Sequence, residues 1–316
     1  MKIIGTGSAL PALAVTNDML SEFLDTNHEW IFTRTGIAQR RIMSSETLED
    51  LAVLAAKQAL DNAKLDASAL ELIICANIAN QYVTPGLSCV VQGKIGANCP
   101  CFDISSACSG FIFAMDIANA YIKSGTVKNI LIVCADEISK IVNWNTRDTS
   151  VLFGDGAGAV IVSQGENLKS IRLATISAVE PLFCINELGN TPFNKIESVA
   201  VAGLSMNGKD VYKMAVNAAI QDINFVMNEA GITQKEISFY LLHQANLRIL
   251  DTIRDYLGEK DEKFPKNIHK YGNTSAASIP ILLDEMSREG QLKKGDMLVM
   301  CAFGAGFSSG ACVVEW

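Results

Sequence analysis

One cysteine in this 316-residue sequence stands where a thiol can act as a nucleophile. Cys108 lies among small residues, directly before a segment, residues 111–123, whose apolar positions recur with helical spacing. This arrangement places the thiol on a tight turn at a helix N-terminus, where unpaired N–H groups and the positive end of the helix dipole stabilise a thiolate. Cys108 is therefore either a nucleophile or one more buried thiol.

Two further residues have side chains suited to the same chemistry. His28 and His269 lie in polar segments and are expected on the surface, whereas His243 ends an apolar strand, at the edge where α/β sheets build their sites. Asn273 lies in a run of small and polar residues, and its amide can donate a hydrogen bond. Taken alone, His243 fits a core histidine and Asn273 a turn residue equally well.

A cysteine, a histidine and an asparagine in separate loops form either of two catalytic sets. In a hydrolase of the papain kind, the histidine deprotonates the cysteine and the asparagine orients the histidine. In an enzyme that forms carbon–carbon bonds, the cysteine holds an acyl group while histidine and asparagine donate hydrogen bonds to an enolate oxygen. The order of the three residues along the chain does not separate these reactions.

The segments that carry these residues belong to two similar halves. A helical pattern over residues 46–63 is followed by a short apolar strand, and the same order returns with a helical pattern over residues 212–230. Each half also closes on a glycine-rich turn that leads into a strand. Alternating helices and strands indicate the α/β class with a mainly parallel sheet. We therefore predict a duplicated α/β chain with halves at residues 1–165 and 166–316.

Composition and charge limit the classes of partner. Hydrophobic residues make up 49% of the chain and charged residues 19%, as in ordinary globular proteins. A net charge of -8 gives no overall field that attracts nucleic acid or an anionic membrane, so neither partner is expected. Glycine and serine interrupt the charge-free stretch of residues 297–314, which favours two strands and a turn over a membrane helix.

The nine cysteines bear on compartment and metal binding. The chain opens without an apolar signal segment, so we expect it to stay in the cytoplasm with its thiols reduced. Cys99 and Cys101 are too close in sequence for half of a zinc site, and no second pair at metal-binding spacing follows. No metal is predicted.

Nearly the whole chain resembles β-ketoacyl-acyl carrier protein synthase III, a family of the thiolase superfamily. The matching motifs follow one another in the family's order, at residues 3–8, 29–37, 107–111, 153–158, 243–248, 272–278 and 302–307. The resemblance implies a thiolase-like fold of duplicated halves in αβαβα layers, and a homodimer. It also favours the carbon–carbon bond-forming reaction over hydrolysis.

The resemblance implies a role for each residue of the catalytic set. Cys108 would accept the acyl group of an acyl-CoA primer, with the backbone N–H groups of Cys108 and Ala305 as the oxyanion hole. Malonyl-acyl carrier protein would then lose CO2, and Nε2 of His243 and the amide of Asn273 would stabilise the resulting enolate. Acyl-CoA and malonyl-acyl carrier protein are substrates in this scheme, and no cofactor is implied.

Substrate-binding residues are implied in the same way. Trp30, Arg34, Arg147 and Asn246 match positions that contact coenzyme A, by stacking on adenine and by pairing with phosphate. Lys213 and Arg248 match positions that dock the acidic acyl carrier protein. The helix after Arg248 departs from the pattern, because acidic residues stand at 251 and 255 where well-known members carry consecutive lysines.

The acyl pocket departs from the family in one place. Thr84 stands where many acetyl-specific members have phenylalanine, at the floor of the partner subunit's acyl pocket, so longer primers are expected. Leu152, Phe303 and the loop around Phe183 are expected to line the remaining wall. The expected function is to start fatty acid synthesis. The alternative is a related condensing enzyme with a different acyl donor or acceptor, in secondary metabolism or biotin-precursor synthesis.

Overall fold

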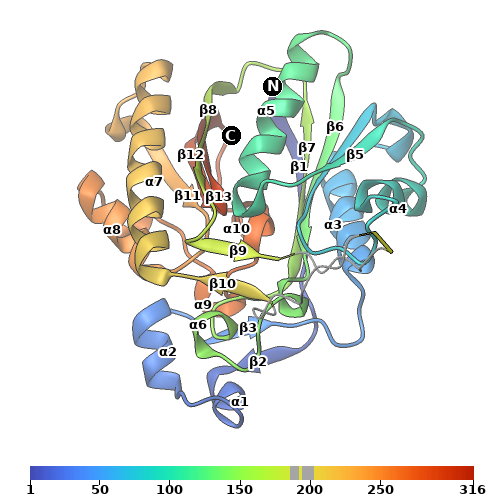
Figure 1. Cartoon of the computed structure of the whole chain (residues 1–316). Coiled ribbons are helices and arrows are strands. Elements are labelled where there is room, and N and C mark those ends of the chain that lie inside the picture. The colour runs from blue at the N-terminus through green and yellow to red at the C-terminus, as the bar shows by residue number, and fades with distance from the viewer. Residues whose placement is uncertain (186–191, 194–202) are drawn as a thin grey trace.

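The computed structural model describes residues 1–185, 192–193 and 203–316. Two β-sheets stand side by side, with helices between them and on both outer faces (Figure 1). In the first sheet the strand order is β1-β7-β6-β4-β5, and in the second it is β11-β12-β13-β8. The strands are β1 (Lys2–Ala9), β4 (Leu72–Ala76), β5 (Cys101–Ile104), β6 (Asn129–Asp136), β7 (Gly156–Ser163), β8 (Leu168–Ala178), β11 (Ile237–Leu242), β12 (Met297–Gly304) and β13 (Gly306–Glu315).

Both sheets are mixed, so the prediction of a mainly parallel sheet is wrong. The pairs β4–β5, β4–β6 and β11–β12 are parallel, whereas β1–β7, β6–β7, β12–β13 and β13–β8 are antiparallel. The closing strand of each half causes the difference. A short glycine turn sends β13 straight back along β12, and such a connection can only make an antiparallel pair. The predicted succession of strand, turn and strand over residues 297–314 is confirmed.

Six long helices complete five layers. They are α3 (Leu48–Ala63), α4 (Leu87–Ile95), α5 (Gly110–Lys123), α7 (Gly208–Ala230), α8 (Leu247–Leu257) and α10 (Ser278–Arg288). One apolar core joins α3 and α4 to the first sheet, a second joins α7 and α8 to the second sheet, and a third joins α5 and α10 to both sheets. The predicted αβαβα arrangement is confirmed. The boundary at residues 165 and 166 stays a prediction.

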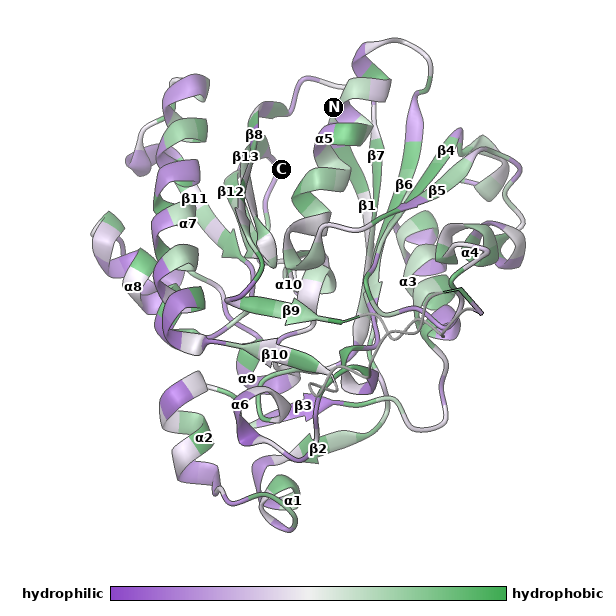
Figure 2. Cartoon of the chain, viewed as in Figure 1, coloured by the Kyte–Doolittle hydropathy of each residue, from purple (hydrophilic) through white to green (hydrophobic). Residues whose placement is uncertain are grey.

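Both faces of each sheet are covered by helices, so its strands need nearly continuous apolar sequence. In β4, Ile73 and Cys75 pack in the core under α3, whereas Leu72, Ile74 and Ala76 pack in the central core under α5. Successive side chains of a strand point to opposite faces, and here both faces are covered. In Figure 2 the strands of both sheets are coloured mainly as hydrophobic, whereas α3, α7 and α8 alternate between hydrophilic and hydrophobic residues.

Side-chain caps, rather than apolar spacing, set the starts of α3 and α7. Thr47 and Asp50 form a capping box, so α3 begins at Leu48. The Asn207 side chain accepts from the backbone N–H of Asp210, so α7 begins at Gly208, four residues before the predicted start at 212. The first turn of α7 is polar, and apolar periodicity therefore misses it.

A smaller unit packs below the open ends of the two sheets (Figure 1). Its own apolar core includes Ile31, Val151, Phe153 and Ile268. Its elements are β2 (Ala14–Thr16), α1 (Asn17–Ser21), α2 (His28–Thr35), β3 (Gln39–Arg41), α6 (Arg147–Ser150), β9 (Leu182–Cys184), β10 (Leu204–Met206) and α9 (Ile268–Tyr271). Short 3-10 turns connect the larger elements, namely η1 (Ala67–Ala69), η2 (Ala107–Ser109), η3 (Ile138–Lys140), η4 (Gln234–Glu236), η5 (Asp261–Lys263) and η6 (Ser275–Ala277).

Candidate active site

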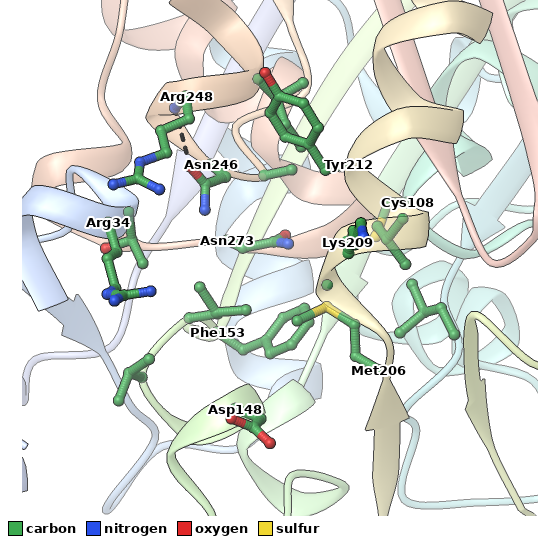
Figure 3. A pocket seen from close by; sticks show the side chains of 18 of the residues that line it. Arg34, Cys108, Asp148, Phe153, Met206, Lys209, Tyr212, Asn246, Arg248 and Asn273 are labelled. Carbon is green, nitrogen blue, oxygen red and sulfur yellow. Dashed lines mark hydrogen bonds between the residues drawn. The ribbon is translucent and has the colours of Figure 1, made fainter.

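A pocket of about 660 Å³ opens between the sheets and the smaller unit. Cys108, His243 and Asn273 line its inner end and are 8%, 1% and 6% exposed. Each comes from a different loop, so the structure brings together the three residues that the sequence leaves far apart. Figure 3 shows Cys108 on one side of the pocket, Arg34, Asn246 and Arg248 on the other, and Asn273 between them in this view.

Both halves of the chain hold the turn that carries Cys108. The residue lies in η2, directly before α5, and Ala107 beside it has a left-handed φ of 44°. The Ser109 hydroxyl donates to the Ser106 carbonyl, and its oxygen lies 2.8 Å from Oγ of Ser308 in β13. Gly304 passes so close that a Cβ there would lie 2.7 Å from the Cys108 nitrogen. A side chain at residue 304 would therefore push this turn out of place.

The electrostatic setting of Cys108 differs from the sequence expectation. Burial raises the pKa of its thiol to about 12, although α5 begins only two residues later. Desolvation disfavours a buried thiolate more than the helix N-terminus stabilises it. The expected stabilisation of a thiolate by the helix N-terminus is therefore outweighed by burial, and the thiol has to lose its proton in the course of the reaction.

His243 directly follows β11 and is held as a neutral ring. Its Nδ1 lies 2.7 Å from Oγ of Ser278, and the backbone N–H of Gln244 donates to that same oxygen. The Ser278 hydroxyl can donate its proton to Nδ1 while its oxygen accepts from Gln244. With that hydrogen bond made, the proton of the neutral ring is on Nε2. Burial lowers the pKa of His243 to about 3, so the ring donates a hydrogen bond and is a poor acceptor of protons.

Asn273 is fixed through both its side chain and its main chain. Its Oδ1 accepts from the backbone N–H of Ser275 at 2.9 Å, which leaves the amide nitrogen to donate into the pocket. Its own N–H donates to the Leu152 carbonyl at 2.9 Å, and its carbonyl accepts from Gly154 at 3.0 Å. The segment around Leu152 therefore sets where the Asn273 amide lies.

The inner pocket thus presents two neutral hydrogen-bond donors beside a buried thiol. In a hydrolase of the papain kind the histidine has to take the thiol proton, and a ring with a pKa of about 3 is unsuited to that task. Two donors suit an oxygen on which negative charge develops. The geometry therefore favours the carbon–carbon bond-forming set.

The outer pocket is cationic although the chain is acidic. Of its lining residues, Asp148 is the one carboxylate, whereas five carry positive charge: Arg34, Arg147, Lys209, Lys213 and Arg248. In the part of the chain that the structure describes, none of these five cations lies within 4.0 Å of a carboxylate. Their charge therefore stays available to an anionic ligand.

Trp30 lies between two of these cations. The guanidinium carbon of Arg34 is 4.7 Å from the centre of the Trp30 ring, and that of Arg147 is 4.6 Å from it. Asn246 also lines the pocket, and its side chain caps α8 by accepting from the backbone N–H of Arg248. All four residues expected to contact coenzyme A are therefore in one pocket.

Some pocket residues escaped the sequence reasoning. Lys209, Tyr212 and Met206 line the pocket from β10 and the first turn of α7, and Asp148 lines it from α6 (Figure 3). The Tyr212 hydroxyl lies 2.6 Å from Oγ1 of Thr252 and ties α7 to α8. The sequence signal for Lys209 is the capping pair Asn207 and Asp210 around it, which marks a helix N-terminus facing a loop.

The predicted acyl-pocket residues divide into two groups. Leu152 and Phe303 line the pocket. In the loop around Phe183, Leu182 lines the pocket and Phe183 itself does not. Thr84 is exposed and outside this pocket. Because Thr84 was assigned to the pocket of a partner subunit, its position in a single chain leaves that assignment a prediction. Ala305 is half-buried in the turn after β12.

Acidic residues neutralise the other arginine of α8. Arg254 forms ion pairs with Asp251, Asp255 and Asp261, and Lys266 pairs with two of the same carboxylates. The charge of Arg254 is therefore satisfied within this face. On α8, Arg248 is left as the cation that faces the pocket.

Membrane spans and metal-ligand groups are both absent from the described chain. Over residues 1–185, 192–193 and 203–316, no helix combines the length and apolar character that crossing a membrane requires. In the same residues no three His, Cys, Asp or Glu side chains are grouped as metal ligands are. That the enzyme needs no metal stays a prediction.

Comparison with known proteins connects this pocket to one family. Residues 102–178 match the family described as 3-oxoacyl-[acyl-carrier-protein] synthase III, and residues 227–316 match its C-terminal domain. The chain is 40% identical to the β-ketoacyl-[acyl-carrier-protein] synthase III of Clostridium acetobutylicum over 320 aligned positions, covering 100% of this chain and 98% of that one.

Solved structures give the same result. The 3-oxoacyl-[acyl-carrier-protein] synthase III of Aquifex aeolicus superposes with a TM-score of 0.92 at 42% identity, covering 100% of this chain and 99% of that one. The β-ketoacyl synthase III of Thermus thermophilus superposes with a TM-score of 0.93 at 33% identity and the same coverage. The predicted thiolase-like fold is therefore confirmed, and the names of these relatives favour fatty acid synthesis over the alternative pathway. The chain belongs to the β-ketoacyl-[acyl-carrier-protein] synthase III family and is an acyl-transferring condensing enzyme of fatty acid synthesis.

Proposed function

We propose that this enzyme moves the acyl group of an acyl-CoA primer onto Cys108 and then condenses it with malonyl-acyl carrier protein. The observation that carries the proposal is the pair of neutral donors, His243 and Asn273, that line one inner pocket together with a buried thiol. A donor pair of this kind serves the enolate of a decarboxylated malonyl group.

The first half-reaction is acyl transfer to the thiol. The Cys108 sulfur attacks the thioester carbonyl while its proton leaves, and the proton ends on the sulfur of departing coenzyme A. Because burial keeps the thiol protonated at rest, attack and proton loss have to be coupled. The backbone N–H groups of Cys108 and Ala305 are proposed to hold the carbonyl oxygen, and the close approach of Gly304 to the Cys108 nitrogen supports this.

The second half-reaction forms the carbon–carbon bond. The malonyl carboxylate leaves as CO2, and its bonding electrons form an enolate that receives hydrogen bonds from Nε2 of His243 and from the amide of Asn273. The enolate carbon attacks the acyl carbonyl on Cys108, the C–S bond breaks, and the thiolate that leaves takes up a proton from water. Two neutral donors stabilise the enolate oxygen without adding a negative charge that would oppose it.

The outer pocket is proposed to bind the two anionic substrates. Trp30, Arg34, Arg147 and Asn246 would hold coenzyme A, since an indole face stacks on adenine and guanidinium groups pair with phosphate. Lys213 and Arg248 are exposed at the same mouth and would meet the acidic carrier. This local excess of cations reconciles an acidic chain with acidic partners.

The walls beyond the catalytic set indicate the class of primer. Leu152, Phe153, Met206, Phe303 and Phe307 are apolar and line the pocket. A carboxylate at the far end of a primer would be desolvated there without a partner. We therefore propose a primer with an apolar acyl chain.

We further propose a homodimer in the cytoplasm. Strand β5 ends the order of the first sheet, and near it Val83 is 97% exposed and Tyr82 is 45% exposed. An unpaired strand edge beside exposed apolar side chains favours a partner. Thr84 lies in this stretch, which supports its contact with the acyl group of a partner subunit. Eight cysteines of the described chain form no disulfide, as suits a reducing compartment; they are Cys75, Cys89, Cys99, Cys101, Cys108, Cys134, Cys301 and Cys312.

The test separates the two half-reactions. Incubation with acetyl-CoA or butyryl-CoA alone should add one acyl group per subunit in intact-mass analysis, and later addition of malonyl-acyl carrier protein should release β-ketoacyl-carrier. Cys108→Ala should abolish the adduct, whereas Cys89→Ala, outside the pocket, should retain it. An adduct that persists in Cys108→Ala would overturn the assignment.

A further inference from the structure

Arg40 is a buried cation that no part of the proposed reaction uses. It lies in β3 and is 0% exposed, and it is the largest fully buried side chain among the described residues. Its guanidinium donates to three neutral oxygens, namely the Val15 carbonyl at 3.1 Å, Oδ1 of Asn17 at 2.8 Å and the Val151 carbonyl at 2.7 Å. Throughout the described residues, no carboxylate comes within ion-pair distance of it.

Burying this guanidinium costs free energy that a residue with only a space-filling role would not cost. Burial lowers the pKa of Arg40 to about 10, so the group is still charged at neutral pH. An unpaired buried cation costs free energy even when hydrogen-bonded, and apolar side chains of similar volume often replace buried charges without loss of stability. The guanidinium is therefore explained better by what it holds than by packing.

The side chain of Arg40 runs between two segments that line the pocket. A Cβ added at Gly154 would lie 3.2 Å from Cβ of Arg40, and one added at Gly272 would lie 3.1 Å from it. Gly272 also has a left-handed φ of 68°. Both segments therefore approach the stem of Arg40 at a glycine, and the guanidinium reaches on to the carbonyl of Val151.

Hydrogen bonds continue from Arg40 to Asn273. The Val151 carbonyl is held by Arg40, the next carbonyl, of Leu152, accepts from the Asn273 N–H, and Gly154 donates to the Asn273 carbonyl. Asn273 is thus bonded on both sides to the segment that Arg40 holds. The turn of Cys108 is held separately, by Ser308 of β13 and by the close passage of Gly304.

We propose that Arg40 is a positioning residue, which places the amide of Asn273 for the decarboxylation step by fixing segment 151–154. The proposal rests on the proposed function, because it needs Asn273 to act on the enolate. It follows that loss of the guanidinium slows decarboxylation and leaves acylation of Cys108 nearly unchanged. A misplacement of about 1 Å at a reacting group can cost on the order of a hundredfold in rate.

The experiment compares Arg40→Met with Arg41→Met. Arg41 is the next residue of the same strand, and its guanidinium binds the carbonyls of Pro11 and Ala12, away from segment 151–154. We expect Arg40→Met to lower CO2 release from malonyl-acyl carrier protein by roughly ten- to a hundredfold, with the rate of acyl adduct formation on Cys108 within about threefold of normal. Arg41→Met should leave both rates within about threefold.

A double-variant cycle gives the decisive readout. If Arg40 acts through Asn273, adding Arg40→Met to Asn273→Ala should lower the remaining decarboxylation by less than about twofold. If Arg40→Met lowers the decarboxylation rate by the same factor in the native protein and in Asn273→Ala, the proposal is overturned. An equal fall in the acylation and decarboxylation rates would overturn it as well. Should Arg40→Met not fold, Arg40→Lys tests the same point, because its single ammonium cannot hold three oxygens at once and the selective loss should remain.

Failure of the proposed function gives a different result. In that case the unaltered enzyme neither gains an acyl group on Cys108 nor releases CO2 from malonyl-acyl carrier protein. When the unaltered enzyme does both, a normal decarboxylation rate in Arg40→Met contradicts only the positioning role of Arg40 and leaves the proposed function standing.

Discussion

His243 and Ser278 lie 2.7 Å apart, from Nδ1 to Oγ, where β11 ends and α10 begins. When the Ser278 hydroxyl donates in this contact, the proton of the neutral ring is on Nε2, which then donates in the pocket. The contact also connects the second sheet to a central helix at the site itself. The chemistry of His243 therefore depends on a residue whose side chain is absent from the pocket wall.

Ser278→Ala should slow decarboxylation of malonyl-acyl carrier protein by about fivefold, because the ring then loses the bond that orients it, and a hydrogen bond is worth about 1 kcal/mol. Acyl loading of Cys108 should change little. Ser287→Ala, on the same helix, is the control, and CO2 release is the measurement. Equal rates in the two variants would show that Ser278 does not orient the ring.

His243→Ala and Asn273→Ala should each lower the rate of decarboxylation by on the order of a hundredfold, since each removes one donor to the enolate. Both variants should still form the acyl adduct, because neither residue is needed to activate the thiol. Single-turnover acylation followed by mass analysis checks this. A loss of acylation in His243→Ala as complete as in Cys108→Ala would make His243 the base.

Stability should depend on pH through His243 in a stated direction. Its pKa is about 3 in the folded chain and about 6.5 when unfolded, so between these values the unfolded chain binds the extra proton. The contribution of the buried neutral His243 ring to the free energy of unfolding is fully present above pH 6.5. As the pH falls below 6.5, this contribution decreases by up to about 1.4 kcal/mol per pH unit. The advantage in unfolding free energy of the native protein over His243→Gln should shrink accordingly.

Urea unfolding of both proteins at several pH values between 7.5 and 4.5 measures that difference. Asp136 has the opposite effect, because burial raises its pKa to about 6 and the folded chain then binds the extra proton. Asp136 is present in both proteins, so its effect cancels. A difference that stays constant with pH would mean that the folded ring titrates normally.

Arg248→Glu should raise the KM for malonyl-acyl carrier protein at least tenfold and the KM for acyl-CoA far less, because a surface charge acts mainly on docking of an oppositely charged partner. Added salt should reduce the difference. Lys57→Glu makes the same change of charge on α3, remote from the pocket, and should change neither KM. Equal increases for both substrates would assign Arg248 to the shared entrance.

Thr84→Phe should narrow the range of primers. The native enzyme is expected to accept butyryl-CoA and hexanoyl-CoA as well as acetyl-CoA, because each added methylene gains about 0.8 kcal/mol of burial while a bulky floor excludes it by overlap. Values of kcat/KM across the series for both proteins test this. An unchanged profile in Thr84→Phe would remove Thr84 from chain-length selection.

The sequence predicted the parts of the site that depend on local pattern. Cys108 before an apolar helix and His243 after an apolar strand are such positions, because strand and helix ends are visible as changes of periodicity. The layers of the fold followed from the resemblance, and one helix of each outer face, α3 and α7, followed from its apolar spacing. Lys209 was missed because the first turn of α7 has no apolar residue facing the core.

Properties that depend on burial could not be predicted in this way. The helix after Cys108 indicated a low pKa for the thiol, yet desolvation by residues distant in sequence raises it to about 12. Arg40 shows the same limit. In the sequence it belongs to a polar stretch with a second arginine beside it, and only the folded chain shows that Arg40 is enclosed while Arg41 reaches the neighbouring carbonyls of Pro11 and Ala12.

The two guanidinium groups on Trp30 have a consequence for substrate entry. Arg34 and Arg147 both lie against the indole, at 4.7 Å and 4.6 Å from its centre, and Arg147 is also bonded to the Asp25 carbonyl. A purine that stacks on this ring has to displace one guanidinium from it, and the displaced group then lies beside the incoming phosphates. Each cation–π contact given up costs about 0.5–1 kcal/mol at an exposed site. If coenzyme A stacks on Trp30 as proposed, arginine would act as an internal competitor for its purine, and bases without phosphates are expected to bind more weakly than phosphorylated ones.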